Sequence, residues 1–420
     1  MDRVRKRERA LLAALRLPRQ RRFEVEESLD ELGRLAESAG AEVVGRVTQE
    51  RQAPTPKLYF GKGKVDELKA SSAREGANLM ISDDPLSPVQ ERNLVGSLGL
   101  KVIDRTALIL DIFAQRARTM EGKLQVELAQ LSYLLPRLVG QWKHLERLGG
   151  GIGTRGPGET QLESDRRMIR HRIEKIRGEL GRVRVHRRLL RDRRKAAGVP
   201  VVALVGYTNA GKTTLLNHLT GAGHTAADQL FVTLDPAARV VARPSRAPFI
   251  LTDTVGFIRK LPHQLVAAFK ATLEELEEAD VLLHVVDASH PGLEEQMEAV
   301  ESLLGELELA HRPTIVALNK VDRLDADAAL GALVERFDAV AVSARTGEGM
   351  TALLDRIERA LRPGVERIRL RIPYRDGTAL AQCYERGRVL SRTDGVDGID
   401  LEVELPRRLL RALEPYRQTP

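Results

Sequence analysis

The sequence has little of what stabilises small secreted proteins or anchors a protein in a membrane. It contains a single cysteine, Cys383, among 420 residues, which excludes a disulfide within the chain and is typical of a reducing compartment. The apolar run nearest the N-terminus, residues 10–15, is too short to span a bilayer, and arginines flank it. Aromatic residues make up 4% of the chain, so its cores must consist mainly of aliphatic side chains. We therefore expect a cytoplasmic protein without stable membrane insertion.

The basic charge is concentrated in one segment. The chain carries 67 Lys and Arg against 59 Asp and Glu, a formal net charge of +8. Between Arg166 and Lys195, 14 basic residues stand against 3 acidic ones, so that segment carries +11 and the remainder of the chain sums to −3. A solvated helix face needs less charge than this. The pattern predicts contact with a polyanion, most simply a nucleic acid.

Residues 206–213 read G-Y-T-N-A-G-K-T and follow the apolar run of residues 201–205. A buried strand that enters a glycine loop and then opens a helix is the setting that a phosphate loop requires. Backbone N–H groups of the loop and the helix N-terminus attract a phosphate chain. The pattern predicts that Lys212 reaches the terminal phosphates and that the Thr213 hydroxyl holds Mg²⁺.

Two polar loops are predicted to sense the terminal phosphate. The first switch loop, residues 231–236, contains Thr233, whose hydroxyl and N–H can meet Mg²⁺ and the γ-phosphate. The second switch loop, residues 253–257, places Asp253 at a strand end and Gly256 three residues later. We expect Asp253 to hold a magnesium-bound water and the Gly256 N–H to contact the γ-phosphate.

Residues 319–322 read N-K-V-D and indicate the base. Asp322 can accept hydrogen bonds from N1–H and the exocyclic amine of guanine, whereas adenine would leave the carboxylate unpaired. Lys320 can cover the ring, Asn319 can tie the base site to the phosphate loop, and a backbone N–H at Ser343–Ala344 can donate to guanine O6. In this order, at successive strand ends, the motifs predict a GTPase that hydrolyses GTP to GDP and phosphate.

The site residues are assigned from these motifs. We expect catalytic roles for Lys212, Thr233 and Gly256, and a magnesium site at Thr213, Thr233 and, through water, Asp253. The nucleotide-binding set contains these residues and the rest of the motifs: Gly206, Tyr207, Thr208, Asn209, Ala210, Gly211, Thr214, Phe231, Val232, Thr254, Val255, Asn319, Lys320, Asp322, Ser343 and Ala344.

Hydrophobic periodicity predicts an α/β protein of several domains. A basic mobile tail, 1–22, precedes a small α/β domain, 23–116, in which strands and helices alternate. A long antiparallel helical hairpin, 117–197, leads into the GTPase domain, 198–363, where successive apolar runs predict a doubly wound, mostly parallel sheet. A small α+β domain, 364–420, ends the chain.

The hairpin has two matching apolar seams with heptad spacing. The first seam is Leu124, Leu128, Leu131, Leu135, Leu138, Trp142 and Leu145. The second, which only Arg187 interrupts, is Ile169, Ile173, Ile176, Leu180, Val183, Arg187 and Leu190. The tip, residues 149–158, is glycine-rich and longer than a hairpin needs, and its Arg155 can stack on a base or bind phosphate.

The chain resembles the HflX-type GTPases, a branch related to the Obg proteins. The resemblance rests on residues 151–167, G-I-G-T-R-G-P-G-E-T-Q-L-E-S-D-R-R, and on residues 231–236, with Val232 where alanine is usual. It implies binding to the large ribosomal subunit and the splitting of stalled ribosomes under stress, with the tip near ribosomal RNA of the peptidyl-transferase region. It also allows ATP as a second substrate. The basic residues that we expect at such an interface are Arg155, Arg166, Arg167 and Arg170.

Several alternatives remain open at this point. Phe257 stands where Ras-like proteins have a water-orienting glutamine, which predicts slow hydrolysis without a partner or ion. Asn209 either helps coordinate K⁺ at the phosphates or only shapes the loop. A ribosome-assembly GTPase and a switch acting on an acidic protein partner are the competing functions, whereas Asp322 disfavours an ATP-driven RNA remodeller. We expect no DNA partner.

Overall fold

The computed structural model describes residues 7–141, 157–197, 199–221, 231, 237–243, 246–260, 276–324, 327–361, 365–406, 409–410 and 413–418. The chain divides into two compact units. The first comprises Met1–Arg184, Ala227–Asp235 and Val255–Thr272; the second comprises Val185–Ala226, Pro236–Thr254 and Leu273–Pro420. Two short pieces that the sequence assigns to the GTPase domain therefore belong to the N-terminal unit.

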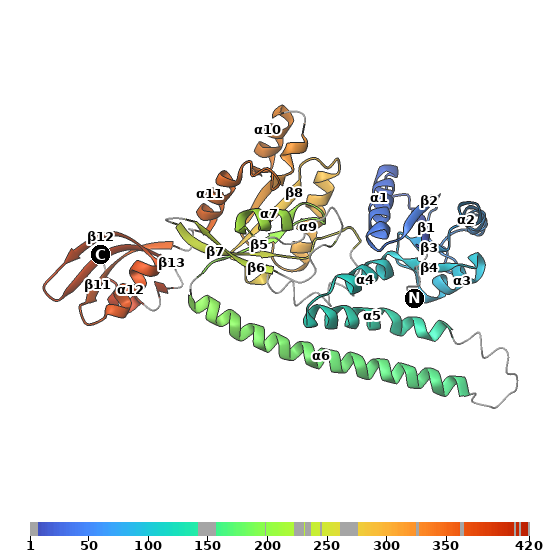
Figure 1. Ribbon diagram of the computed structural model, residues 1–420, viewed down its shortest axis with the longest axis horizontal. Coiled ribbons are helices and arrows are strands. Elements are labelled where there is room, and N and C mark those ends of the chain that lie inside the picture. The colour runs from blue at the N-terminus through green and yellow to red at the C-terminus, as the bar shows by residue number, and fades with distance from the viewer. Residues whose placement is uncertain are drawn as a thin grey trace, which may run out of the picture. The chain divides into compact units, whose positions relative to one another are not determined.

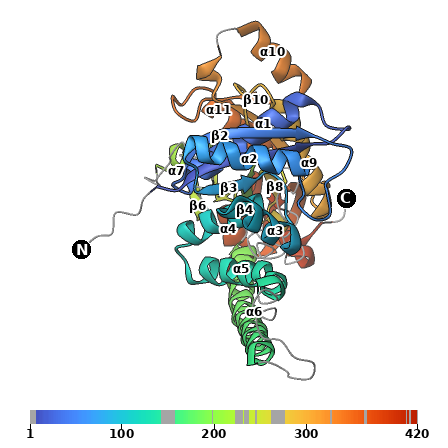
Figure 2. The same cartoon turned by 90° about the vertical axis from the view of Figure 1, so that its right-hand side faces the viewer.

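The N-terminal domain is built on a four-stranded parallel sheet of order β2-β1-β3-β4, covered by helices on both faces (Figures 1 and 2). Its strands are β1 (Arg9–Arg16), β2 (Glu42–Glu50), β3 (Leu79–Ser82) and β4 (Lys101–Asp104). Its helices are α1 (Arg22–Ser38), α2 (Lys62–Glu75), α3 (Pro88–Leu98) and α4 (Arg105–Arg116). Alternate residues of β1 enter two cores: Leu12 packs with the side chains of α1 and α4, and Leu11 packs with those of α2 and α3.

The expectation of a mobile tail over residues 1–22 was wrong for β1. Arg9–Arg16 is a central strand that pairs in parallel with both β2 and β3. Its six apolar residues are almost completely buried, with exposed fractions of 2% or less. A short apolar run that is buried on both faces is typical of a strand in a parallel sheet, and the flanking arginines lie at its two ends.

The two long helices of the hairpin are α5 (Met120–Gln141) and α6 (Pro157–Ala197). Leu124 of α5 packs with Ile176 and Leu180 of α6, and Arg172 pairs with Glu127 at 2.6 Å, which fixes an antiparallel arrangement. The opposite face of α5 packs into the core of the N-terminal domain through Val126, Ala129 and Tyr133. Trp142, Leu145 and residues 149–156 of the tip, Arg155 among them, lie outside the described residues, whereas residues 157–158 of the tip begin α6.

The GTPase domain contains a six-stranded sheet of order β10-β9-β8-β5-β7-β6. Its strands are β5 (Val201–Val205), β6 (Ala237–Arg243), β7 (Arg246–Asp253), β8 (Val281–Asp287), β9 (Thr314–Asn319) and β10 (Val340–Ala341). All neighbours are parallel except β6 and β7, so the doubly wound, mostly parallel sheet is confirmed. The sequence missed β6, an antiparallel edge strand.

Helices cover both faces of this sheet. Side chains of α7 (Lys212–Thr220) and α11 (Met350–Leu361) pack on one face. Those of α9 (Leu293–Glu306) and α10 (Asp327–Arg336) pack on the other. The motifs therefore stand at the carboxyl ends of parallel strands, where open α/β sheets bind ligands.

The C-terminal domain contains a three-stranded antiparallel sheet of order β11-β13-β12, on which α12 packs. It contains β11 (Val365–Pro373), α12 (Gly377–Arg386), β12 (Arg388–Asp394) and β13 (Gly398–Pro406). Cys383 is fully buried in its core. Among the described helices of the whole chain, none combines the length and apolar character needed to cross a bilayer.

Candidate nucleotide-binding site

The phosphate loop runs from the end of β5 to the start of α7, and glycine is required at both of its ends. Gly206 has φ of 147°, and a Cβ there would lie 2.2 Å from the carbonyl oxygen of Val285. Gly211 has φ of 97°, and a Cβ there would lie 2.2 Å from Nδ2 of Asn319. Asn209 adopts a left-handed conformation, with φ of 62°, which asparagine tolerates better than most side chains. The loop is therefore held in a backbone shape that other sequences rarely adopt.

Lys212 is the first residue of α7, and its side chain folds back over the loop. Its Nζ donates to the carbonyl oxygens of Gly206 at 2.9 Å and of Tyr207 at 2.7 Å. Burial lowers the pKa of Lys212 to about 8, although the charge of Asp253 opposes this shift. The ammonium is thus a buried cation next to backbone N–H groups at a helix start, an arrangement suited to phosphate oxygens.

The magnesium residues expected in the second unit converge. Thr213 donates its hydroxyl to Oδ2 of Asp253 at 2.8 Å, although 40 residues separate them in the chain. Asp253 ends β7 and is completely buried. Thr254 donates to the carbonyl of Leu204 at 2.6 Å and ties the end of β7 to β5. A hydroxyl and a carboxylate side by side form an oxygen donor set of the kind that Mg²⁺ prefers, so the residues fit this ion.

Hydrogen bonds connect the segments expected to bind the base with the phosphate loop. Asn319, at the end of β9, donates to the carbonyl of Ala210 at 2.8 Å and accepts from the N–H of Ala344 at 2.9 Å. This side chain therefore joins the phosphate loop to the segment that follows β10. Asp322 accepts the hydroxyl proton of Ser343 at 2.6 Å.

Asp322 also pairs with Arg345, at 2.7 Å. The Ser343 hydrogen bond and the Arg345 charge keep the pKa of Asp322 below its usual value, despite the partial burial that opposes this. The carboxylate is therefore ionised and oriented before any base arrives. Each of its oxygens has a second lone pair, and guanine N–H groups can use these.

His284 lies in β8, directly opposite Val205 of the loop-bearing strand, and it is 2% exposed. Burial is the main reason that the pKa of His284 is lowered to about 4, and the charge of Lys212 adds to this shift. The folded state therefore holds a neutral histidine, whereas the unfolded chain protonates this side chain near pH 6.5.

The stability that the neutral His284 provides should be present in full above pH 6.5. It should be lost as the pH falls toward 4, up to roughly 3 kcal/mol. Melting temperatures of the wild type and of His284→Gln should be measured between pH 7.5 and 5. The melting temperature should fall less steeply with decreasing pH in the variant than in the wild type. If the melting temperatures of the two proteins changed with pH in parallel, His284 would not be the group that causes the loss of stability.

Described residues of both switch loops pack with the N-terminal domain, within the first unit. Phe231 is buried, and its ring contacts that of Phe113 edge-on with centroids 4.6 Å apart. Val255 and Ile258 pack against the same core. Phe257 is also buried, and its phenyl side chain has no polar group that could orient a water. The chain segments next to the expected γ-phosphate contacts are thus part of another domain's core.

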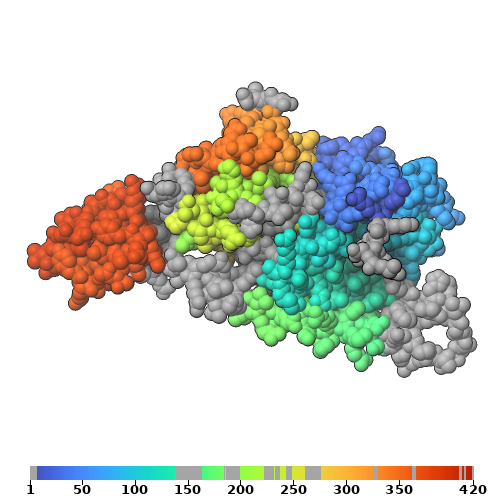
Figure 3. Space-filling view, in the orientation of Figure 1, coloured from blue at the N-terminus to red at the C-terminus, as the bar shows by residue number. Residues whose placement is uncertain are grey.

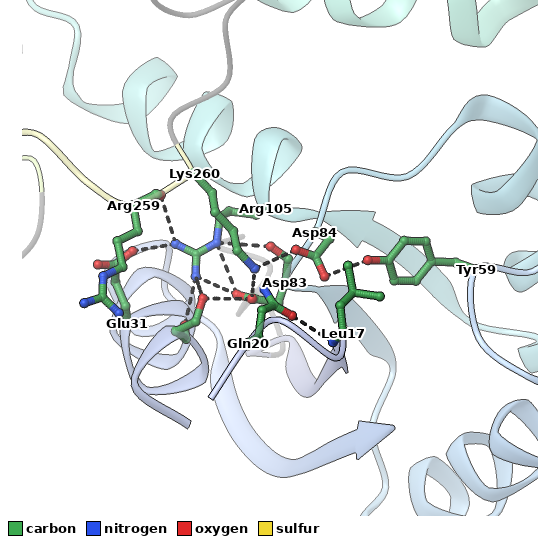
Figure 4. A network of polar contacts seen from close by, with 10 residues as sticks. Leu17, Gln20, Glu31, Tyr59, Asp83, Asp84, Arg105, Arg259 and Lys260 are labelled. Atoms are coloured by element: carbon green, nitrogen blue, oxygen red, sulfur yellow. Dashed lines mark hydrogen bonds and ion pairs between the residues drawn. The ribbon is translucent and has the colours of Figure 1, made fainter. Parts of the chain in front are cut away.

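Two basic residues that follow the second switch loop end in an acidic cluster of the N-terminal domain (Figure 4). Lys260 pairs with Asp83 at 2.5 Å and with Asp84 at 2.6 Å. Arg259 pairs with Glu27 of α1 at 2.6 Å. Lys260 has φ of 55°, a strained conformation that persists where its surroundings hold it.

The centre of this cluster is Arg105, the first residue of α4, which is 1% exposed. It pairs with Glu31 at 2.5 Å and with Asp83 at 2.6 Å, and it donates to the carbonyl of Ser28 at 2.8 Å. Burial alone would raise the pKa of Asp83, but the charges of Arg105 and Lys260 outweigh it and hold that pKa at about 2.

Known proteins resemble the chain over nearly its whole length. Family models match as follows: GTP-binding GTPase N-terminal at 26–114, GTP-binding GTPase Middle Region at 116–194, 50S ribosome-binding GTPase at 201–320 and HflX C-terminal domain at 331–416. The GTPase HflX of Caldanaerobacter subterraneus is 49% identical over 415 residues, 98% of this chain and 94% of that protein. The chain belongs to the HflX family of GTPases.

The GTPase HflX of Escherichia coli is 47% identical over 388 residues, 90% of each chain. A solved GTP-binding protein of Sulfolobus solfataricus in complex with GDP covers 84% of this chain and 98% of its own, at 27% identity and a TM-score of 0.43. Membership of the HflX family confirms the resemblance that the hairpin and switch motifs indicate. It also confirms GTP binding and hydrolysis as the activity of this chain.

Within this HflX-family GTPase, the structure brings together the phosphate loop, Asp253, the N-K-V-D segment and Ser343–Ala344. Val232 and Thr233 lie outside the described residues, and Gly256 belongs to the first unit. Sequence reasoning missed Arg345 as a partner of Asp322, and it missed Asp287, which pairs with Lys320 at 2.7 Å. A signal existed for Asp287, since it is the charged residue that ends the apolar run of β8.

Proposed function

We propose that this GTPase binds the large ribosomal subunit in the cytoplasm and uses GTP to split or rescue stalled ribosomes under stress. The observation that supports this most directly is the exposed basic side of α6, together with a 50S ribosome-binding GTPase match over residues 201–320. Contact near the peptidyl-transferase region, through Arg155 at the tip, is the finer part of this proposal.

The exposed side of α6 has the chemistry of a phosphate-binding surface. Arg167 and Arg170 are exposed, Arg166 is half-buried, and further exposed basic residues follow along the helix at Lys175 and Arg177. The opposite side of α6 is apolar and packs against α5 through Ile176 and Leu180. In Figure 3 the surfaces of α5 (teal) and α6 (green) adjoin. A rigid helical support with cations on its free side can neutralise several backbone phosphates at once.

The nucleotide chemistry follows from the site. Lys212 and the loop N–H groups bind the phosphates, Asp322 selects guanine, and Gly256 and Thr233 contact the γ-phosphate. Thr213, Thr233 and, through water, Asp253 would hold Mg²⁺, which would supply positive charge beside the phosphate oxygens. Phe257 cannot orient the attacking water, so we expect slow hydrolysis until a partner completes the site.

Charge reversal on α6 should weaken subunit binding. In a variant with Arg166, Arg167 and Arg170 changed to Glu, lost phosphate contacts should lower affinity for purified large subunits roughly tenfold or more and flatten its salt dependence. Co-sedimentation across a salt series measures both.

The matched control reverses three basic residues on α2, Lys62, Lys69 and Arg74, which are exposed in the same unit. Both variants change the net charge equally. Equal losses in the two variants would mean that only overall charge matters, and GTP binding should be unchanged in both.

We further propose that Asn209 helps coordinate K⁺ beside the phosphates. Its left-handed backbone places it inside the loop, three residues before Lys212. Exchanging Na⁺ for K⁺ at fixed ionic strength should then raise the GTP hydrolysis rate roughly tenfold, because the ion supplies positive charge in the transition state. The gain should disappear in Asn209→Ala while GTP binding persists. Equal rates in both salts for the wild type would leave Asn209 with a loop-shaping role only.

A further inference from the structure

Two strand ends meet beside the base site. Asp287 is the last residue of β8 and lies opposite Asn319, the last residue of β9, in the parallel pair. The N–H of Ala288 donates to the carbonyl of Asn319 at 2.8 Å and closes this end of the ladder. Lys320 follows Asn319 directly, and its Nζ lies 2.7 Å from Oδ2 of Asp287. The side chains are only 14% and 13% exposed, so solvent screens this ion pair less than a surface pair.

The carboxylate of Asp287 is itself fixed in place. Its Oδ1 accepts the hydroxyl proton of Ser289 at 2.7 Å and the backbone N–H of the same residue at 3.1 Å. Both contacts engage the same oxygen, which leaves Oδ2 facing Lys320. The partner of the lysine is therefore an oriented acceptor.

The backbone of Lys320 is equally constrained. It has φ of 64°, a left-handed conformation that costs free energy in any residue with a side chain. Asn319 on one side is hydrogen-bonded to Ala210 and Ala344, and Asp322 on the other is bonded to Ser343. With the backbone fixed at one end and the ammonium at the other, the four-carbon stem of Lys320 has little freedom left.

We propose that Asp287 is a positioning residue for guanine nucleotides, which acts by holding the stem of Lys320 ready to cover the base. This inference rests on the proposed role of Lys320 in the base site. Lysine has one of the largest rotamer entropies of all side chains. The ion pair with Asp287 restricts the rotamers of Lys320 before the ligand binds, so less entropy is lost on binding. GTP and GDP share the same base, so the ion pair should increase the affinity for both nucleotides equally. The chemistry at the phosphates should be unaffected.

The test is a double-mutant cycle of Asp287→Asn and Lys320→Met, read out as Kd for GTP and GDP and as kcat at saturating GTP. Each single change should raise both Kd values about tenfold, the size expected when a free lysine stem must be ordered on binding. The double variant should be no weaker than Lys320→Met alone, because Asp287 acts only through Lys320. In Asp287→Asn, the ratio of the GTP and GDP affinities and the value of kcat should stay unchanged.

Asp280→Asn is the matched control. This carboxylate precedes the other end of β8 and accepts the N–H of Val201 at 2.8 Å, away from the base motifs. It should leave both Kd values within about twofold of the wild type. If Asp287→Asn fails to fold, Ser289→Ala keeps the charge of Asp287 and the backbone N–H bond but removes the hydroxyl hydrogen bond to Oδ1. It should raise both Kd values about two- to threefold in the wild-type background and not at all in the Lys320→Met background.

The outcomes distinguish a failure of the proposed role of Lys320 in the base site from a failure of the positioning role of Asp287. No effect of Lys320→Met would contradict the proposed role of Lys320 in the base site. An effect of Lys320→Met without one of Asp287→Asn, or effects that add fully in the double variant, would overturn the positioning role alone. A loss of kcat in Asp287→Asn would likewise contradict it, because the proposed action is confined to binding.

Discussion

Replacing Asp322 by Asn should lower the affinity for GTP by roughly 10²- to 10⁴-fold. The variant loses two hydrogen bonds to a charged acceptor, worth about 1.5–3 kcal/mol each, because its amide N–H₂ faces the guanine amine. Xanthosine triphosphate carries an oxygen in place of that amine, so it should bind the variant better than GTP does. Ser343 can still donate to the asparagine oxygen, which preserves the local fold.

Titration with fluorescent GTP and xanthosine triphosphate measures both affinities. Asp280→Asn is again a suitable control, because it makes the same chemical change at the opposite end of the sheet. Unchanged GTP affinity in Asp322→Asn would refute the assignment of the guanine site. Equal losses for both nucleotides would instead indicate general damage to the loop.

Replacing Arg105 by Met should destabilise the N-terminal domain by about 3–5 kcal/mol. The guanidinium is completely buried, and its removal leaves the carboxylates of Glu31 and Asp83 without their main cation. Lys260 still pairs with Asp83, but Glu31 is 5% exposed and cannot recover solvation. The stability of Arg105→Lys should lie between those of the wild type and Arg105→Met. Lysine keeps the positive charge but lacks the forked guanidinium that reaches both carboxylates.

Thermal unfolding of the full chain by calorimetry measures this effect on the transition that belongs to the first unit. Arg22→Met is the control, since that side chain is 81% exposed and pairs with Glu26, one helical turn away, on the surface of α1. The control should change stability by less than about 0.5 kcal/mol. Similar shifts in both variants would contradict a buried cluster centred on Arg105.

The motif residues were predictable because each stands at the end of an apolar strand. Asp253, Asn319 and Ser343 follow runs that only a buried parallel sheet explains, and the topology then brings their side chains to one edge. The same reasoning missed β6, whose exposed Val240 and arginines do not alternate clearly, since one face of this edge strand is open to solvent.

Other features depend on contacts between residues far apart in the chain. Residues 10–15 read as a tail because a six-residue apolar run has no local partner, and β2 and β3 that flank it come later in the sequence. The pair of Lys260 with Asp83 spans 177 residues, and no spacing rule connects them. Asp287 could have been found from its place at the end of β8, but its role needs the neighbouring Lys320.

The most direct test of the account is the rate of GTP hydrolysis with and without purified large ribosomal subunits. Phe257 cannot orient the attacking water, and we propose that the basic side of α6 contacts ribosomal RNA. We therefore expect large subunits to raise the turnover of GTP roughly tenfold or more, and high salt to abolish the increase. A turnover that stays the same at every subunit concentration, at low salt, would contradict the proposed action on the ribosome.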